Sequence, residues 1–277
     1  MDNKIRSNVD LKYFGEKVEI EKEFNIGNEE ERYVYQVKCK GNSYILKGFK
    51  IHLEHVTPEN YKSADLFMTN LIQINEVFQE YYFAKVASLF NPHIAAPLFM
   101  DFTIDLAKSK TAYSYIYIEI IFEHGGIPLN NIKPTTLELT YNLMRQSANA
   151  LFLLHNLNIA HFDIKPDNMV YDSRKDLLKI IDMGSAFGQT KKKKLTGTTV
   201  LLEGKIRSAT LEFAPPEVVS MIKGSVVYPG LKLTSAGVDV YCWGMSFFTL
   251  LTDRKDEELA IDYKKYKMAT EKTMKNS

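Results

Sequence analysis

One eight-residue segment, His161-Phe-Asp-Ile-Lys-Pro-Asp-Asn168, constrains this chain more than any other feature of its sequence. Asp163 precedes Asn168 by five positions, and the segment joins a predicted helix to a predicted strand. The pattern therefore places a carboxylate beside an amide oxygen. A carboxylate can orient a hydroxyl group and accept its proton, and an amide oxygen can bind a hard cation such as Mg²⁺. Few purely structural roles explain this combination at this spacing.

A second carboxylate follows fourteen residues after Asn168, in the segment Ile181-Asp-Met-Gly184. Asp182 lies at the end of a predicted strand, and Gly184 lets the chain turn sharply behind it. Taken singly, this segment is most simply a turn. In the same way, Lys47 alone is most simply a solvent-facing strand lysine, and Asp239 alone an ordinary helix residue. A functional interpretation therefore depends on the combination of these residues and not on any one of them.

The remaining sequence predicts strands first and helices second, which is a two-lobed α+β architecture. Alternating apolar residues and turn signals predict strands at 33–39, 43–47, 98–104, 113–122, 169–171 and 178–181, with a turn at Gly41-Asn42. Apolar periodicity and caps predict helices at 57–89, 135–155 and 235–251. Thr57 is the expected cap of the first helix and Asn91-Pro92 its expected end. The apolar stripe expected on the second helix is Leu139, Leu143, Ala150, Leu151 and Leu154. A Gly125-Gly126 break marks the expected boundary between the two parts.

Composition limits the classes of protein to which this chain can belong. Its 277 residues suffice for a sizeable core, and its net charge of +1 argues for neither nucleic acid nor a membrane as partner. Its two cysteines are far apart in sequence, which fits reduced thiols. The N-terminus lacks the apolar core of a signal peptide, and the longest apolar run, Tyr113–Phe122, is too short for a membrane span. We expect an intracellular, cytoplasmic protein, with the nucleus left open.

Together these motifs resemble the protein-kinase family. The family's catalytic loop, His-Arg-Asp-Leu-Lys-Pro-x-Asn, is matched at His161, Asp163, Lys165, Pro166 and Asn168, and its Asp-Phe-Gly motif at Asp182 and Gly184. The resemblance implies that Asp163 is the catalytic base and that Lys165 stabilises the transferred phosphoryl group. It further implies that Asn168 and Asp182 hold Mg²⁺ and that ATP is the phosphoryl donor.

Further landmarks follow in the family's order, from about residue 20 to 251. Tyr44-Ile-Leu-Lys47 is similar to the Val-Ala-Ile-Lys strand, which makes Lys47 the ligand of the α- and β-phosphates. Ala209–Glu217 is similar to the segment that ends in Ala-Pro-Glu. Val238–Gly244 is similar to the helix whose aspartate, here Asp239, braces the catalytic loop.

The resemblance also implies a fold and a nucleotide site. The fold is bilobal, with a small β-rich N-lobe at about residues 14–123 and a larger, mainly α-helical C-lobe at about residues 124–277 of one kinase domain. Nucleotide is expected in the cleft near Gly125. The residues implied to line the site are Ile26, Val34 and Val170 around adenine, Gly27 in the glycine-rich loop, Ile120 as gatekeeper, and Ile121, Phe122 and Glu123 as hinge. Glu80 is expected to pair with Lys47, and Glu76, one turn earlier, is the alternative.

The expected substrates are serine and threonine residues of proteins. Lys165, two residues after the catalytic aspartate, and Thr210 are features of the Ser/Thr kinases within the family. Thr210 is expected to form hydrogen bonds toward Asp163 and Lys165. Small-molecule kinases of related fold carry a His-led pattern where this chain has Lys165 and Pro166, so a metabolite kinase is disfavoured. Neither the individual substrate nor the oligomeric state can be read from the sequence.

The chain departs from the family pattern in three places, and two of them, the glycine-rich loop and the short second lobe, support an alternative, a pseudokinase that acts as an interaction scaffold. The glycine-rich loop is degenerate, because Glu29 and Arg32 stand at its second and third glycines, and Glu29–Glu31 bring negative charge toward an anion. Phe162 replaces the arginine of His-Arg-Asp, so any control exerted through that arginine is absent or built otherwise. The chain also ends about 25 residues after its last predicted helix, so the second lobe is either naturally short or cut short.

Overall fold

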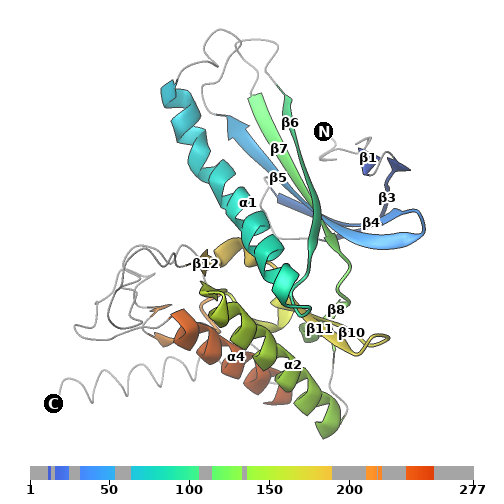
Figure 1. Cartoon of the computed structure of the whole chain (residues 1–277), viewed down its shortest axis with the longest axis vertical. Helices are drawn as coiled ribbons and strands as arrows, with labels where there is room; N and C mark the ends of the chain where they lie inside the picture. The colour runs from blue at the N-terminus through green and yellow to red at the C-terminus, as the bar shows by residue number, and fades with distance from the viewer. Residues whose placement is uncertain are drawn as a thin grey trace, which may run out of the picture. The chain divides into compact units, whose positions relative to one another are not determined.

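The computed structural model describes residues 12–13, 16–24, 32–53, 64–105, 114–132, 136–188, 210–216, 218–219 and 235–252. The chain forms two compact units, Met1–Tyr82 with Ala95–His124, and Phe83–Ile94 with Gly125–Ser277. Strands dominate the described part of the first unit, and long helices lie in the second (Figure 1). The α+β class expected from the sequence is therefore confirmed.

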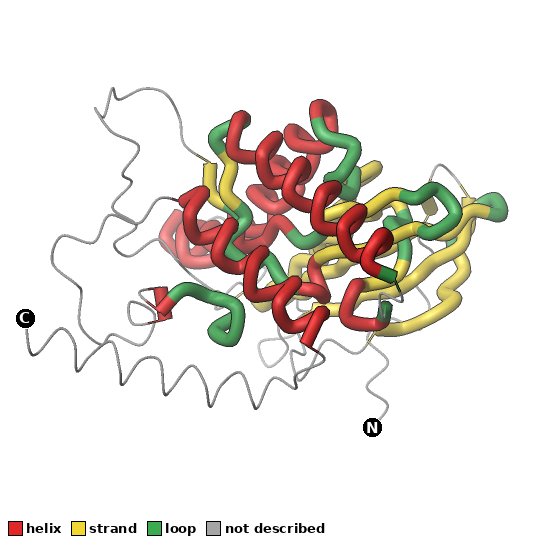
Figure 2. Tube along the Cα trace, turned by 90° about the horizontal axis from the view of Figure 1, so that it is seen from below, coloured by secondary structure: helices red, strands yellow, loops and turns green. Residues whose placement is uncertain are grey.

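A five-stranded antiparallel sheet is the main element of the first unit, and its strands lie side by side in Figure 2. The strand order is β3-β4-β5-β7-β6. The strands are β3 Glu19–Phe24, β4 Arg32–Cys39, β5 Asn42–Leu53, β6 Pro97–Asp105 and β7 Ser114–Glu123, and a short pair, β1 Lys12–Tyr13 and β2 Glu16–Lys17, precedes them. The four strands predicted between residues 33 and 122 are confirmed as β4 to β7.

The turn between β4 and β5 lies one residue earlier than predicted. Cys39 pairs directly with Asn42, so the two turn residues are Lys40 and Gly41 and not Gly41 and Asn42. Both have positive φ, 49° at Lys40 and 81° at Gly41. A two-residue turn of this kind matches the right-handed twist of the strands and requires positive φ at both positions, which Gly41 adopts without strain.

The sheet buries side chains on both faces, as the alternation along its strands requires. The helix-side face contacts helix α1, Ala64–Phe90, through a cluster of Phe49, Ile51, Val77, Ile116, Ile118 and Ile120. The opposite face holds a second cluster of Val18, Tyr33, Tyr35, Val37, Cys39, Leu46 and Ile121. Because the two faces are both buried, a register shift of one residue would exchange the two sets of side chains.

Helix α1 ends at Phe90, directly before the Asn91-Pro92 pair that was predicted to stop it. The sequence separation between Lys47 and Glu80 implies an inserted or extended segment, and the structure assigns part of it to long elements. Strand β5 has 12 residues and α1 has 27, while residues 54–63 lie outside the described part of the chain. The predicted cap at Thr57 falls among these residues.

Residues 83–94 belong to the second unit because their polar groups bind there. Asn91 Nδ2 donates to Ala150 O at 2.9 Å, and Ile180 N donates to His93 O at 2.7 Å. The His93 ring, through Nδ1, contacts Leu178 O at 2.8 Å. The last turn of α1 and the loop after it are therefore fixed to the hairpin and helix of the second unit.

The second unit is built on two helices that contact each other, α2 Leu137–Asn156 and α4 Ser235–Thr252. Thr136 caps α2, because its Oγ1 accepts from Leu139 N at 3.1 Å. The predicted apolar stripe is buried at Leu143, Ala150, Leu151 and Leu154. Within the described residues, no helix is long and apolar enough to cross a membrane.

Short strands connect the helices of the second unit. The hairpin β10 Met169–Asp172 and β11 Leu177–Ile180 pairs with β8 Ile127–Pro128, and β9 Ile159–Ala160 pairs with β12 Phe187–Gly188. Gly126 has φ 120°, and a Cβ there would lie 2.2 Å from Tyr171 O. The approach of β8 to β10 therefore depends on a glycine at this position.

Tyr33 crosses the opposite face of the sheet over Gly48. A Cβ at Gly48 would lie 2.0 Å from carbons of the Tyr33 ring, so only glycine leaves room for it. Tyr33 Oη donates to Glu119 Oε1 at 2.6 Å, and both residues are buried. The aromatic ring and its hydrogen bond thus connect β4, β5 and β7 across one face.

We expect Gly48→Ala to lower the free energy of unfolding by about 2 kcal/mol, because the added methyl group clashes with the Tyr33 ring. The same change at Gly244, where a Cβ meets nothing within 4 Å, is the matched control. Since Gly244 lies in α4, alanine there stabilises by up to about 1 kcal/mol. Urea unfolding measures both. A Gly48→Ala protein as stable as wild type would show that Tyr33 does not occupy this position.

Candidate functional site

The carboxylate of Asp239 fixes the loop that begins at His161. Asp239 is fully buried on α4, and its Oδ2 accepts from His161 N at 2.8 Å while its Oδ1 accepts from Phe162 N at 2.8 Å. The ring of His155, in the last turn of α2, contacts Oδ2 through Nε2 at 2.9 Å. A buried carboxylate is tolerated only when it is hydrogen-bonded in this way. The bracing contact expected of Asp239 is present.

Phe162 stands in a left-handed conformation with φ 64°, and its side chain is buried. This conformation is unfavourable for a bulky residue. The hydrogen bond from Phe162 N to Asp239 and the burial of the ring offset that cost. The chain therefore turns at Phe162 so that the next residue, Asp163, leaves the interior with its carboxylate only partly exposed.

Three neighbours hold the carboxylate of Asp163. Thr210 donates to Asp163 Oδ1 twice, from its Oγ1 at 2.7 Å and from its N at 3.0 Å. Lys165 Nζ lies 3.1 Å from Asp163 Oδ2 and also donates to Thr210 Oγ1 at 2.7 Å. Asn168 Nδ2 donates to Asp163 Oδ2 at 3.0 Å. The contacts expected from Thr210 toward Asp163 and Lys165 are both present.

The protonation of Asp163 follows from these neighbours. Burial alone would raise the pKa of its carboxyl group, but the hydrogen bonds from Thr210 and the charge of Lys165 together outweigh it and hold the pKa below its usual range. Asp163 is therefore an anion at neutral pH. An anionic carboxylate with a hydrogen-bond-accepting oxygen can orient a hydroxyl group and accept its proton.

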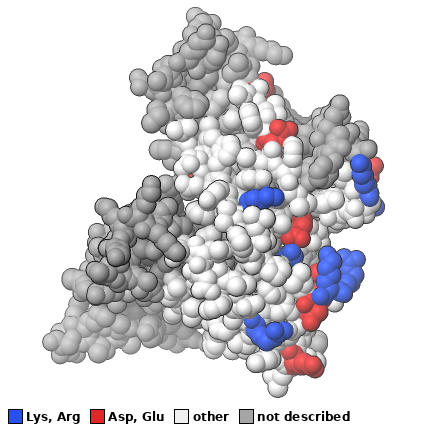
Figure 3. Space-filling view, viewed as in Figure 1, with Lys and Arg blue, Asp and Glu red and all other residues white. Residues whose placement is uncertain are grey.

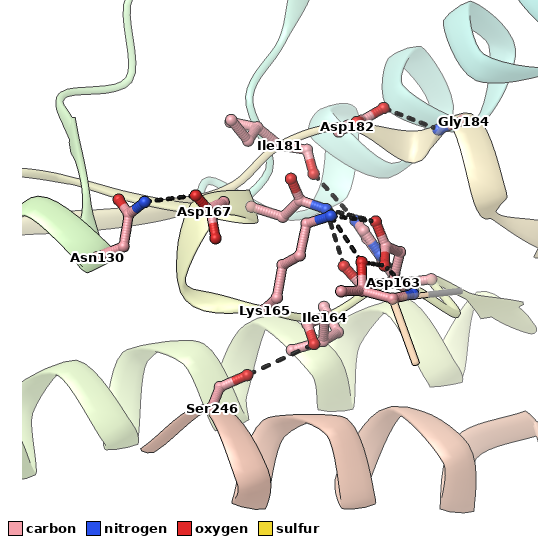
Figure 4. A network of polar contacts seen from close by, with 12 residues as sticks. Asn130, Asp163, Ile164, Lys165, Asp167, Ile181, Asp182, Gly184 and Ser246 are labelled. Atoms are coloured by element: carbon pink, nitrogen blue, oxygen red, sulfur yellow. Dashed lines mark hydrogen bonds and ion pairs between the residues drawn. The ribbon is translucent and has the colours of Figure 1, made fainter. Parts of the chain in front are cut away.

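Asn168 and Asp182 lie at neighbouring positions at one end of the β10–β11 hairpin. Ile181 N donates to Asn168 O at 2.9 Å, which extends the hydrogen-bond ladder of the hairpin by one pair. Asp182 is the residue that directly follows Ile181. Asp182 is left-handed at φ 63°, and its carboxylate accepts from Gly184 N at 3.3 Å (Figure 4). This conformation leads directly into the short 3₁₀ turn Met183–Ser185.

The donor set of these two residues fits a hard cation. Asn168 Nδ2 donates to both Asp163 O, at 2.8 Å, and Asp163 Oδ2, so the amide oxygen of Asn168 remains as a ligand group. Asp182 adds carboxylate oxygens. The described residues contain no cluster of three or more His, Cys, Asp or Glu side chains suited to a metal. Mg²⁺ needs only one or two protein carboxylates, because water and phosphate oxygens complete its shell.

In the first unit, Lys47 and Glu80 form the ion pair expected from the sequence. Lys47 Nζ lies 2.7 Å from Glu80 Oε1, and the exposed fractions of the two side chains are 15% and 4%. Lys47 is therefore not the solvent-facing lysine that its strand alone would suggest. Val34 pairs with Lys47 and Lys47 with Ile120 across the sheet, so these three residues share the helix-side face.

The remaining predicted residues occupy several environments. Ile120 is fully buried in the helix-side cluster, and Ile121 belongs to the cluster on the opposite face. Glu123 Oε1 accepts from Ala96 N at 2.7 Å. Val170 is buried on β10 beside Gly125, where a Cβ would lie 2.6 Å from Val170 Cγ2. Phe122 is half-buried against the helix-side cluster, and Ile26, Gly27 and Glu217 lie outside the described residues.

Two contacts of the site were not predicted. The first is the contact of His155 with Asp239, 84 residues away. The sequence indicates only that a basic residue is favourable in the last turn of a helix, and nothing in it relates this histidine to Asp239. Asp167 accepts a hydrogen bond from Asn130 Nδ2, which connects the loop His161–Asn168 to the 3₁₀ turn Leu129–Asn131 (Figure 4). Both contacts join segments distant in sequence, which a pattern of local spacing does not report.

Charges of both signs are interspersed on the face of the molecule seen in Figure 3. Basic and acidic side chains of the described residues lie near one another there, without a wide field of either sign.

Comparison with known proteins identifies relatives. The family model described as protein kinase domain matches residues 28–276. R436 of Acanthamoeba polyphaga mimivirus, provisionally named a serine/threonine-protein kinase, is 26% identical over 212 residues, which cover 71% of this chain and 70% of that protein. Protein kinase MCK1 of Saccharomyces cerevisiae is 33% identical over 83 residues, 28% of this chain and 22% of the relative. Serine/threonine-protein kinase sax-1 of Caenorhabditis briggsae is 35% identical over 94 residues, 33% and 20% respectively. The matches to MCK1 and sax-1 thus span only about a fifth of those proteins.

We expect Asp239→Asn to destabilise the protein by about 3 kcal/mol, because an amide group in place of one carboxylate oxygen faces a buried backbone N–H of His161 or Phe162. Asp101→Asn is the matched control. The carboxylate of Asp101 also accepts a backbone hydrogen bond, from Phe102 N at 2.8 Å, but it is exposed on β6. Urea unfolding compares the two variants. Equal, small losses would show that the buried carboxylate does not brace the loop.

Proposed function

This chain belongs to the protein kinase family, and from that premise we propose that it is a serine/threonine protein kinase that transfers the γ-phosphoryl group of ATP to protein hydroxyl groups. The observation that carries the proposal is the arrangement at Asp163. An anionic carboxylate is held by Thr210 and Lys165 and lies against Asn168. A scaffold without chemistry would need none of these contacts to be present together.

Asp163 is proposed as the catalytic base. Its carboxylate orients the hydroxyl group of a serine or threonine and accepts its proton as the oxygen attacks the γ-phosphorus. The new bond joins that oxygen to phosphorus, and the bond from phosphorus to the β,γ-bridging oxygen breaks, so that ADP leaves. Because the pKa of Asp163 is held low, the group is ready to accept a proton at neutral pH but remains a weak base. Positioning therefore contributes more to the rate than proton transfer does.

Lys165 and Thr210 are proposed to position the reacting groups. Lys165 Nζ contacts both Asp163 and Thr210, so its positive charge is held next to the site where the phosphoryl group passes. Negative charge on the transferred group is stabilised by such a fixed cation. The side chain and backbone of Thr210 fix one carboxylate oxygen of Asp163 and leave Oδ2 directed toward Lys165 and Asn168.

Asn168 and Asp182 are proposed to hold Mg²⁺ through an amide oxygen and a carboxylate. When bound, the metal would neutralise negative charge on the phosphates of ATP. Lys47 is proposed as the ligand of the α- and β-phosphates. Its ion pair with Glu80, at 2.7 Å, fixes the ammonium group on the helix-side face of the sheet. By the resemblance to the family, Val34 and Val170 are proposed to contact adenine, and Ile120 is proposed as the gatekeeper.

One observation favours the alternative of a pseudokinase scaffold. Where the family has the third glycine of its phosphate-binding loop, β4 begins with Arg32. A side chain at this position prevents the close approach of backbone to phosphate that glycine permits. Against the alternative stand the intact contacts of Asp163, Asn168 and Lys47. The two functions differ in a single observable, transfer of phosphate.

The proposed function predicts that wild type, incubated with Mg²⁺, ATP and a degenerate Ser/Thr peptide pool, transfers phosphate to the peptides, which mass spectrometry detects as an increase in peptide mass. Asp163→Asn should slow transfer by about a hundredfold or more, because it removes the base. Asp101→Asn, an equivalent change at an exposed strand residue, should leave the rate unchanged. Binding of ATP without transfer by wild type would favour the scaffold. Equal rates for Asp163→Asn and wild type would exclude Asp163 as the base.

The pH dependence of catalysis provides a second prediction. Thr210→Val removes a hydrogen bond that lowers the pKa of Asp163, so the pKa rises and the acidic limb of kcat/KM moves to higher pH. The stability that the low pKa contributes is present above the unfolded pKa and is lost as pH falls through the folded pKa, and Thr210→Val should reduce it. Thr249→Val is the control, since Thr249 donates only within α4, to Met245 O at 2.8 Å. Superimposable acidic limbs for Thr210→Val and wild type would contradict the assignment.

A further inference from the structure

Strand register places Arg32 on the same face of the sheet as Lys47. Arg32 pairs with Phe49, and Val34 pairs with Lys47. Directly opposed residues of antiparallel strands point to the same side, and positions two apart share a face. Arg32, Val34, Lys47 and Phe49 therefore all belong to the helix-side face. Tyr33 belongs to the other face, as its ring over Gly48 shows independently.

Two cations lie near the ring of Phe49. Lys47 Nζ is 5.5 Å from the ring centroid and Arg32 Cζ is 5.8 Å from it. Phe49 is buried and packs in the helix-side cluster, so the ring is a fixed platform. Both distances lie within the roughly 6 Å range of cation–π attraction. The aromatic ring thus attracts both positive groups.

The two cations differ in their surroundings. Lys47 is mostly buried and is neutralised by Glu80 at 2.7 Å. Arg32 is exposed at the first position of β4, directly after the segment that carries Glu29–Glu31. A guanidinium group can stack on an aromatic face and still present its N–H groups at its edge, where they bind phosphate oxygens in pairs. Lysine in the same place would offer a single point charge.

We propose that Arg32 is a second phosphate-binding cation of the nucleotide site, positioned beside Lys47 by the ring of Phe49. This inference rests on the proposed function, which assigns Lys47 to the phosphates of ATP. Arg32 stands where the resemblance places the third glycine of the phosphate-binding loop. The side chain supplies by charge what the lost glycine supplied by close backbone approach. The degenerate loop then still contributes to phosphate binding, through the side chain of Arg32 and not through a glycine.

The test compares Arg32→Gln with Lys38→Gln in the full chain. Lys38 lies on the same strand and the same face, is exposed, and has a long ion pair with Glu21 at 3.9 Å, so it matches the change in charge at a distance from Lys47. Calorimetry measures the Kd of adenosine, AMP, ADP and ATP with Mg²⁺ for each protein. We expect Arg32→Gln to weaken ADP and ATP by about tenfold, as for the loss of one charge-assisted contact, while adenosine binding stays unchanged. Lys38→Gln should match wild type for all four ligands.

Two further variants separate placement from charge. Arg32→Lys retains the charge but not the paired N–H groups, and we expect it to recover only part of the loss. Phe49→Leu removes the aromatic platform with little change in apolar character, and we expect a smaller loss for ADP and ATP than in Arg32→Gln. Thermal unfolding without ligand confirms that each variant is folded. For Arg32→Gln, unfolding close to that of wild type is expected, since the side chain is exposed.

The outcomes distinguish this inference from the proposed function. If wild type binds ATP and Arg32→Gln binds it equally well, the inference is wrong and the proposed function stands. If Arg32→Gln weakens adenosine as much as ATP, or chiefly lowers thermal stability, Arg32 serves the fold, for example through the acidic residues of α1, and the inference is also wrong. If wild type binds neither ADP nor ATP, the nucleotide site itself fails and the inference fails with it.

Discussion

The buried carboxylate of Asp239 is the interaction on which the rest of the second unit depends. It accepts hydrogen bonds from two consecutive backbone N–H groups, at His161 and Phe162, inside the protein where water cannot replace it. Those bonds hold Phe162 in its left-handed conformation, and that conformation in turn determines where Asp163 emerges. Thr210, Lys165 and Asn168 then act on a carboxylate whose backbone is already fixed. The polar contacts of the site thus depend on one charged group, the carboxylate of Asp239, which is itself fully buried.

Much of the fold could be predicted because its signals are local. The alternation of Tyr33–Cys39, the Asn91-Pro92 stop and the apolar stripe of α2 each depend on residues close in sequence, and each led to an element close to the observed one. The turn after β4 was misplaced by one residue because Gly41 was read as the first turn residue, whereas its positive φ serves the second, after Lys40. Gly48 was not singled out at all. Its need for glycine arises from the ring of Tyr33 on the neighbouring strand, which sequence spacing does not show.

The contacts of the site likewise divide into those that residues close in sequence predict and those that they do not. Asp163, Lys165 and Asn168 lie within six residues, so their proximity follows from the loop itself, and the contact with Thr210, 47 residues from Asp163, was expected only through a family resemblance. The choice of Glu80 over Glu76 as the partner of Lys47 depended on the length of α1, and the ion pair at 2.7 Å decides it. The shared ring of Phe49 between Arg32 and Lys47 required the strand register, which hydrophobic alternation alone does not fix to the residue.

The packing of α2 against α4 has a practical consequence for anyone who studies this protein in solution. Trp243 is the chain's single tryptophan, and its indole Nε1 donates to Ser147 Oγ at 2.8 Å across the two helices. Indole emission therefore arises at one defined place in the second unit, on the helix that carries Asp239. The first unit contributes tyrosines but no tryptophan. Fluorescence excited selectively at the indole thus follows the helices behind the catalytic loop, while circular dichroism averages over the whole chain. Agreement between the two signals during unfolding is a direct measure of whether the two units lose their structure together.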